Sequence, residues 1–231
     1  MERQIKDMKL NKTIDYTLLR TDAGEDEIID LCEQAKSHGY ASICVNPSYV
    51  KFCAHQLAET DVKVCAVVGF PLGQTTEHVK AYEASEALQN GASEIDAVMN
   101  VPWLKNVCAR KKHKDKAISQ YVAGLKRFVK SCHRRKKDCT TKLILECCLL
   151  TDDEKILACK CAKAAGFDFV KTSTGFSKGG ATVEDVALLR KTVGKRIGVK
   201  ASGGIRTKED ALKMIEAGAN RIGTSALLEL D

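Results

Sequence analysis

Eight short apolar runs, separated by amphipathic stretches, are the feature of this sequence that most restricts its fold. The runs occupy residues 14–19, 41–46, 63–70, 94–101, 142–147, 169–174, 197–202 and 221–225. Each is almost continuously apolar, as expected for a parallel strand buried on both faces. Eight strands that alternate with helices through short connections predict an α/β fold, the (β/α)₈ or TIM barrel. A doubly wound open sheet is the alternative, but it requires fewer strands or a G-x-G-x-x-G loop, which the sequence lacks.

The amphipathic stretches contain signals for the beginning and end of helices. Thr151, Thr182 and Thr207 each precede an acidic residue by three positions, the pattern of a capping box or a close relative of one. Asn46 before Pro47 is a second kind of helix start. Five glycines follow helical stretches at positions suited to a left-handed C-cap: Gly39, Gly91, Gly166, Gly194 and Gly218.

The chain shows no sign of a boundary between domains. It has 231 residues and only 3 prolines, with no low-complexity or linker segment. This length suits one barrel. We therefore predict one domain over residues 1–231, with a short N-terminal extension over about residues 1–12.

The positive charge of the chain is local. The formal net charge is +7, but residues 105–137 contain 13 Lys and Arg against one acid, Asp115, which gives +12 there and leaves −5 for the rest. Such a run is usually the solvated face of a helix, and an anionic partner is the alternative. Because no aromatic residues interleave with the two basic clusters, we do not expect nucleic acid binding.

Location and redox state follow from what the sequence lacks. No apolar run approaches the about 18 residues of a membrane span, and the charged first residues do not resemble a secretory signal. We therefore expect a cytoplasmic protein with no membrane contact. The 11 cysteines include no Cys-x-x-Cys pair, so we expect reduced, mostly buried thiols and no metal site. Cys147 and Cys148 are expected to point to opposite faces of a strand.

Two lysines and an aspartate lie within otherwise apolar strands. Lys171 and Lys200 occur in the similar contexts V-K-T-S and V-K-A-S, on consecutive predicted strands, and Asp96 lies in the fourth. Lysine is rarely buried without a partner or a role. Repulsion between two adjacent ammonium groups and a low dielectric should both favour the neutral amine. A neutral amine can attack a carbonyl to form an imine. We therefore predict Lys171 as the nucleophile, activated by Lys200, with Asp96 as counter-ion and proton shuttle.

Other polar residues at strand ends are candidates for contact with a substrate. Asp15 lies in the first strand, Cys44 in the second and Thr172 directly after Lys171. Active sites of this fold lie at the carboxyl ends of the strands. We therefore expect all three to line the mouth of the barrel, although a strand-end cap for Asp15 and a simple core position for Cys44 remain alternatives.

Small residues follow the last three strands, where barrels of this type often bind phosphate. Glycines allow backbone N–H groups to approach an anion, and a helix N-terminus favours negative charge. The predicted phosphate site contains Gly175, Ser202, Gly203, Gly204, Thr224 and Ser225, and Ser225 is expected to open a final helix. The sequence thus indicates a small phosphorylated substrate.

Several segments resemble the deoxyribose-phosphate aldolase family over about residues 12–226. They include VVGFPLGQTTEHVKAYEA, NGASEIDAVMNV, FVKTSTGF and GVKASGGIRTKEDALKMIEAGANRIGTS. The resemblance implies reversible cleavage of 2-deoxy-D-ribose 5-phosphate to acetaldehyde and D-glyceraldehyde 3-phosphate, in deoxyribonucleotide catabolism. It implies a class I aldolase, a lyase that uses a lysine Schiff base and needs no metal or other cofactor. A homodimer is compatible with the sequence.

The resemblance also assigns roles to residues. It implies that Lys171 forms the imine, that Lys200 lowers its pKa and that Asp96 acts with water as proton donor and acceptor. Gly175, Gly203, Gly204 and Ser225 match the phosphate-binding backbone. Four positions depart from the family pattern: Tyr16 and Arg20 in place of the His and Lys of IDHTLLK, Pro102 in place of a frequent glycine, and Cys147 in place of a threonine. These departures bear on substrate preference and rate.

Two other readings of the sequence remain. One is a different imine-forming aldolase or transaldolase on the same barrel, which only its substrates would distinguish. The other is a non-catalytic scaffold that binds anionic partners through residues 105–137.

Overall fold

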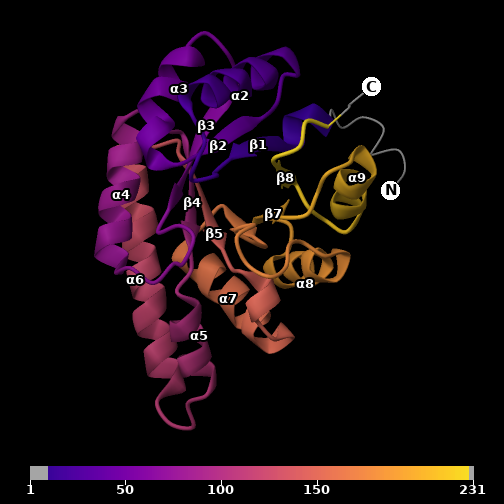
Figure 1. The fold of residues 1–231 in the computed structure, drawn as a ribbon. Coiled ribbons are helices and arrows are strands. Elements are labelled where there is room, and N and C mark those ends of the chain that lie inside the picture. The colour runs from indigo at the N-terminus through magenta and orange to yellow at the C-terminus, as the bar shows by residue number, and fades with distance from the viewer. Residues whose placement is uncertain (1–9, 229–231) are drawn as a thin grey trace.

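The computed structural model describes residues 10–228 and forms a closed barrel of eight parallel strands (Figure 1). Each strand pairs with the next along the chain, and the first pairs with the last. The predicted (β/α)₈ fold is thereby confirmed, and every strand lies within two residues of its predicted beginning. The strands are β1 Ile14–Leu18, β2 Ser42–Val45, β3 Lys63–Val68, β4 Glu94–Val98, β5 Thr140–Ile144, β6 Phe169–Lys171, β7 Gly198–Ser202 and β8 Arg221–Thr224.

Helices connect the strands and surround the barrel. The α-helices are α2 Glu25–Ser37, α3 Val50–Gln56, α4 Glu77–Gln89, α5 Val101–Cys108, α6 Lys114–Arg135, α7 Asp152–Ala165, α8 Val183–Val193 and α9 Lys208–Glu216. Three short 3₁₀ helices are η1 Leu10–Thr13, η2 Pro47–Tyr49 and η3 Cys147–Leu149. Most described connections between strands and helices are short, as the sequence predicted.

The predicted helix ends are largely confirmed. Thr151 and Thr207 form capping boxes with Glu154 and Asp210, whereas Thr182 accepts from a backbone N–H without closing a box. All five predicted C-cap glycines have positive φ. Asn46 precedes η2, but its side chain makes no cap bond there; its Nδ2 donates to the carbonyl of Leu19 at 3.4 Å.

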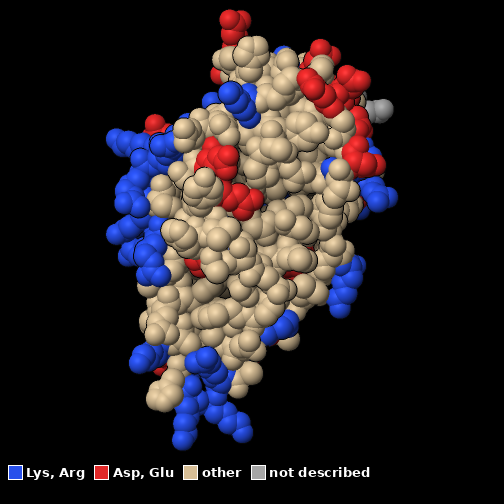
Figure 2. All heavy atoms as spheres, turned by 60° about the vertical axis from the view of Figure 1, so that its left-hand side comes forward, with Lys and Arg blue, Asp and Glu red and all other residues tan. Residues whose placement is uncertain are grey.

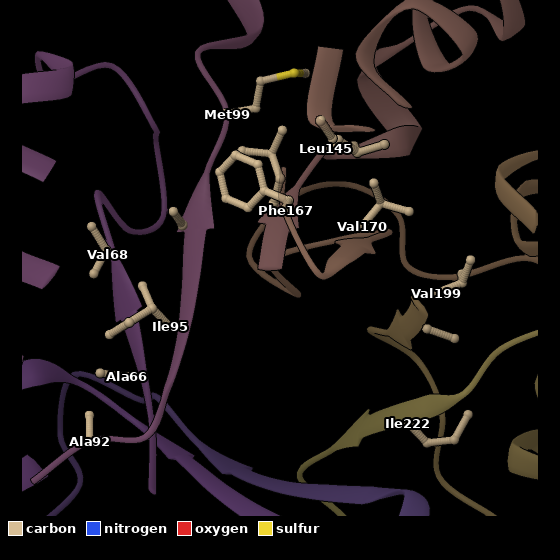
Figure 3. Close-up of a cluster of buried hydrophobic side chains, with 14 of the residues drawn as sticks. Ala66, Val68, Ala92, Ile95, Met99, Leu145, Phe167, Val170, Val199 and Ile222 are labelled. Carbon is tan, nitrogen blue, oxygen red and sulfur yellow. The ribbon is translucent and has the colours of Figure 1, made fainter. Parts of the chain in front are cut away.

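The apolar core lies between the strands and the surrounding helices. Ile95, Val170, Val199 and Ile222 belong to it and are fully buried (Figure 3). In the strands these residues alternate with charged ones, and alternate side chains of a strand point to opposite faces. The outward face therefore packs on the helices, and burial of each large apolar side chain stabilises the fold by roughly 1.5–3 kcal/mol. The charged face points into the barrel.

The basic region forms a helical hairpin that extends beyond the barrel. α5 and α6 are joined by a short turn in which His113 has a φ of 58°, and Trp103 stacks on Tyr121 at a centroid distance of 3.8 Å. Lys and Arg side chains gather at the tip of this hairpin and along one edge of the molecule (Figure 2). The buried side of α6 is apolar, so most of its cations lie on the solvated face.

Three expectations need correction or fall outside the structure. Cys147 and Cys148 lie in η3 rather than in a strand, because β5 ends at Ile144 and Glu146 adopts a left-handed backbone with a φ of 59°. No helix follows β8 within the described residues, so Ser225 does not open one there. Most of the predicted N-terminal extension lies outside the described residues.

In residues 10–228, no helix combines the length and apolarity needed to cross a bilayer.

Candidate active site

A cavity of about 760 Å³ opens at the carboxyl ends of the strands. Its walls come from β1 and the start of α2 on one side and from the loops after β6, β7 and β8 on the other. Among the predicted site residues, those that line it are Lys171, Gly175, Ser202, Gly203, Gly204, Thr224 and Ser225. The structure thus brings the predicted nucleophile and the predicted phosphate site to one cavity.

A single carboxylate joins the two lysines below the floor of this cavity. Lys171 and Lys200 are directly paired across β6 and β7. Asp96 Oδ2 lies 2.8 Å from the Nζ atom of each. Lys171 is 2% exposed and lines the cavity, while Lys200 and Asp96 are completely buried and do not. A substrate in the cavity can therefore reach Lys171 but not Lys200.

This arrangement differs from the expectation that repulsion between two ammonium groups would favour neutral amines. Burial alone favours neutral Lys200, but the carboxylates of Asp15 and Asp96 outweigh it and raise the pKa of Lys200 above its ordinary value. Burial likewise opposes charge on Asp96, yet Lys142, Lys171 and Lys200 hold its pKa well below the usual range. Lys200 is therefore a cation and Asp96 an anion at neutral pH.

A second layer of buried charges lies beneath this group, and the sequence reading missed most of it. Arg221 Nε donates to Asp15 Oδ1 at 2.7 Å, and Arg221 Nη2 lies 3.1 Å from Glu94 Oε2. Lys142 contacts Glu94 and lies 3.1 Å from Asp96 Oδ1. Strand alternation was the available signal, because Glu94 and Asp96 are two residues apart in β4 and must share the inward face.

Three predicted substrate-binding residues lie away from the cavity wall. Asp15 is fully buried, receives a hydrogen bond from Ser42 and lies 2.5 Å from Lys200. Cys44 is fully buried inside the barrel. Thr172 joins β6 to β7, because its hydroxyl donates to the Ser202 carbonyl at 3.2 Å and accepts from the Ser202 N–H at 3.1 Å. The side chains of all three lie below the cavity surface that a ligand would touch.

The loops after β6 and β7 have the backbone shape expected of a phosphate cradle. Gly175, Gly203 and Gly204 have φ values of 87°, 86° and 82°. A Cβ at Gly203 would lie 3.0 Å from the Cα of Gly180, so a side chain there would have both backbone strain and a close contact. Ser202 Oγ donates to the Ser173 carbonyl at 2.7 Å, which fixes the beginning of this loop.

The opposite wall contains residues that the sequence reading singled out only as departures from the family. Tyr16 and Arg20 line the cavity, together with Asp26 and Asp30 of α2. Phe176, half exposed, packs edge-on against Phe70 at a centroid distance of 5.1 Å and closes another side. These side chains are placed to affect substrate choice.

Arg221→Gln is expected to destabilise the protein by about 3 kcal/mol, because it leaves Asp15 and Glu94 buried with one cation fewer. Burial raises the pKa of Asp15, but the positive charges of Lys200, Arg221 and Lys142 outweigh burial, so the pKa lies below its ordinary value. A lowered carboxyl pKa stabilises the fold above the unfolded value of about 3.9 and this stability is lost as pH falls through the folded value. Without Arg221 the Asp15 pKa rises, so acid unfolding should begin at a higher pH.

Urea denaturation at several pH values measures both effects. Arg196→Gln is the control, because Arg196 is exposed. Equal stability of the two variants, with the same onset of acid unfolding, would show that Arg221 is not needed to neutralise this network.

Comparison with known proteins gives the same picture over nearly the whole chain. The sequence model of the DeoC/LacD family aldolases matches residues 12–229. A deoxyribose-phosphate aldolase of Streptococcus sanguinis is 55% identical over 219 residues, which cover 95% of this chain and 94% of that protein. One of Listeria monocytogenes is 52% identical over 95% of this chain and 93% of its own length.

Solved structures agree with the sequence comparisons. An aldolase called QR15 is 39% identical and superposes with a TM-score of 0.84 over 95% of this chain and 93% of that one. Deoxyribose phosphate aldolase from Aeropyrum pernix, described as a unique tetramer, is 33% identical with a TM-score of 0.83 over 94% and 87% of the two chains. The similarity covers all eight strands rather than a single motif.

Proposed function

Because this chain belongs to the DeoC/LacD family of aldolases, we propose that it is a deoxyribose-phosphate aldolase that works through an imine on Lys171. The observation that supports this most directly is the triad at the cavity floor, where Asp96 Oδ2 lies 2.8 Å from both Lys171 and Lys200 and only Lys171 reaches the cavity. The substrate is 2-deoxy-D-ribose 5-phosphate, and the products are acetaldehyde and D-glyceraldehyde 3-phosphate.

Asp96 prepares Lys171 for attack. Only the neutral amine is a nucleophile, so an ammonium form of Lys171 must first lose a proton, and Asp96 Oδ2 is within hydrogen-bond distance of Nζ to accept it. Lys200 remains a cation and donates a hydrogen bond to the same oxygen. Its charge favours the carboxylate form of Asp96, so that Asp96 readily gives the proton up again. Lys171 then adds to C1 of the open-chain sugar. Asp96 returns its proton to the hydroxyl group that leaves as water, which gives a protonated imine and restores the carboxylate.

The bond that breaks is C2–C3, since only C2 adjoins the imine carbon and can pass its electron pair to it. Cleavage between C3 and C4 would leave no electron pair next to the imine and would not produce acetaldehyde. Asp96, acting through a water molecule, accepts the C3 hydroxyl proton as D-glyceraldehyde 3-phosphate leaves. The same proton returns to C2 of the enamine, and hydrolysis of the imine releases acetaldehyde and frees Lys171.

The phosphate group positions the reacting carbons. The cradle formed by Gly175, Gly203, Gly204 and Ser225 lies on the same cavity as Lys171. Binding energy from a group that does not react can hold C1 near the nucleophile and lower the entropic cost of the first step. The protonated imine is itself the electron sink, so the proposal requires no metal or other cofactor.

The proposal also includes the setting of the enzyme. A small phosphorylated sugar as substrate is compatible with the predicted cytoplasmic location and with a role in deoxyribonucleotide breakdown. No step of the lysine-based reaction depends on a reducing environment. A homodimer is compatible with the proposal.

Borohydride trapping with acetaldehyde, followed by peptide mass spectrometry, tests the mechanism, and a cleavage assay with 2-deoxy-D-ribose 5-phosphate tests the substrate. We expect an ethyl adduct on Lys171 and release of both products. An adduct on Lys171 without cleavage of this sugar would point to a different imine-forming aldolase. A folded protein with neither result would contradict the proposal.

Ser225→Asp should raise KM for the phosphorylated substrate by about tenfold or more, because two negative charges at the cradle repel each other in a partly exposed site. The kcat/KM for unphosphorylated 2-deoxyribose should change little, since that sugar places no charge there. Ser225→Asn is the matched control, because it has nearly the same shape without the charge. Equal losses with both sugars would place the phosphate elsewhere.

A further inference from the structure

Glu146 is a buried carboxylate that the mechanism above does not use. It lies two residues beyond the end of β5 and directly before η3, and it is 5% exposed. Its backbone is left-handed, with a φ of 59° and a ψ of 61°. Residues other than glycine seldom adopt this conformation, and those that do gather at functional sites, where their surroundings hold them in place. Within residues 10–228, the other such residue is His113, in the exposed turn between α5 and α6.

The carboxylate of Glu146 binds both polar groups of one residue in the loop after β6. Thr174 donates its backbone N–H to Oε1 of Glu146 at 3.2 Å and its hydroxyl to Oε2. The same hydroxyl accepts the N–H of Phe176 at 3.1 Å. Gly175, the first residue of the phosphate cradle, therefore lies between two N–H groups that Glu146 fixes, one directly and the other through the Thr174 hydroxyl.

Backbone hydrogen bonds join Glu146 to the strand that carries the nucleophile. The N–H of Leu145 donates to the Lys171 carbonyl at 2.9 Å, and the N–H of Cys147 donates to the Thr172 carbonyl at 2.8 Å. Glu146 lies between these two donors, so the strand of Lys171 sets the position from which its side chain starts. The position of the nucleophile and the position of the cradle are thereby linked through one side chain.

The far end of the same loop lies against the second part of the cradle. The N–H of Ala181 donates to the Gly203 carbonyl at 3.0 Å. A Cβ added at Gly180 would clash with that carbonyl oxygen, so the two backbones are in direct contact. Because residues 174–181 thus touch both parts of the cradle, a shift at Thr174 would displace Gly203 as well as Gly175.

Glu146 acts at a distance from the substrate. Thr174 lines the cavity, whereas Glu146 does not, so the carboxylate can affect a ligand only through the loop that it holds. An ionised carboxylate only accepts hydrogen bonds, and it therefore satisfies the N–H and the hydroxyl of Thr174 together. Such charge-assisted bonds are roughly twice as strong as those between neutral groups. A glutamine amide offers one oxygen and a group that donates.

We propose that Glu146 is a positioning residue for the substrate phosphate, which it holds in register with Lys171 by fixing Thr174 and the loop that follows. Its effect on the rate of cleavage rests on the proposed function, whereas its effect on phosphate binding does not. No covalent bond to Glu146 forms, and no proton passes through it.

Glu146→Gln tests this role, because it keeps the length of the side chain and removes the charge. We expect kcat/KM for 2-deoxy-D-ribose 5-phosphate to fall at least about tenfold, the scale of one lost hydrogen bond to a charged group. The kcat/KM for unphosphorylated 2-deoxyribose should change little, and borohydride should still trap acetaldehyde on Lys171, because neither small molecule uses the cradle. A general loss of folded protein would lower both rates equally, so equal losses with the two sugars would overturn the proposal.

Glu154→Gln is the matched control. Glu154 also accepts a backbone N–H, that of Thr151 at 2.8 Å, but it does so at the start of α7 and outside the cavity wall. Its substitution should leave the ratio of kcat/KM between the two sugars unchanged. A fall in this ratio as large as that in Glu146→Gln would show that the preference for the phosphorylated sugar does not depend on Thr174.

Inorganic phosphate gives a measurement that does not depend on activity. Its dissociation constant follows from the rise of the thermal unfolding midpoint with phosphate concentration. It should increase at least about tenfold in Glu146→Gln and stay the same in Glu154→Gln. An unchanged constant in Glu146→Gln would overturn the proposal. If the unaltered protein binds phosphate but does not cleave 2-deoxy-D-ribose 5-phosphate, the proposed function is wrong, and the phosphate constants alone decide the role of Glu146.

Discussion

Lys171→Arg is expected to lower kcat for 2-deoxy-D-ribose 5-phosphate by roughly 10⁴-fold or more, the scale on which loss of a catalytic nucleophile acts. The guanidinium of arginine stays protonated at neutral pH and cannot form the imine. It still provides a cation for Asp96, so the loss reports on chemistry rather than on an unpaired charge. The adduct with acetaldehyde and borohydride should disappear with the activity.

Lys195→Arg is the matched control for this result. Lys195 is an exposed lysine outside the cavity wall, so the same substitution there should leave both rate and trapping unchanged. Substantial cleavage by the Lys171 variant, with trapping moved to another lysine, would show that the nucleophile is elsewhere.

Asp96→Asn is expected to affect both rate and stability. Loss of the proton acceptor should lower kcat by about 10²–10⁴-fold. Asp96 is also the shared partner of Lys142, Lys171 and Lys200, all of them nearly or fully buried. Removing its charge leaves three buried cations with fewer partners, so the free energy of unfolding should fall by about 3–5 kcal/mol.

Steady-state kinetics and urea denaturation separate the two effects of this substitution. Asp61→Asn is the control, because Asp61 is exposed and its substitution should change neither quantity. A variant that keeps the stability of the original protein but loses activity would show that the buried lysines do not need the Asp96 carboxylate for the stability of the fold. A variant that keeps the rate would exclude Asp96 from proton transfer.

The fold was predictable because its signals are local. Residues 14–18 and 198–202 form strands as predicted, since an apolar run bounded by turn residues is a property of a few neighbouring positions. The capping box at Thr151 is equally local, because its two partners are three residues apart. Lys171 and Lys200 were identifiable for a similar reason, since a lysine within an apolar strand is conspicuous without knowledge of its neighbours.

The arrangement inside the barrel was less predictable. Asp15, Cys44 and Thr172 were expected to line the mouth, but depth along a strand is set by how far each strand is shifted against the next, and the sequence does not record that shift. Glu94, Lys142 and Arg221 were missed because each resembles an ordinary charged residue at a strand end. Their pairing joins residues 127 positions apart in the case of Glu94 and Arg221.

The sequence by itself determined that this chain forms eight alternating strands and helices and that two lysines and an aspartate lie within the strands. Only the tertiary structure decided that Asp96 lies between the lysines and that Lys171 alone meets the cavity. It also decided that Lys200 is held as a cation rather than a neutral amine. Local patterns follow from the period of the backbone, whereas a pKa and an exposure depend on which distant groups closure of the barrel brings within a few ångströms.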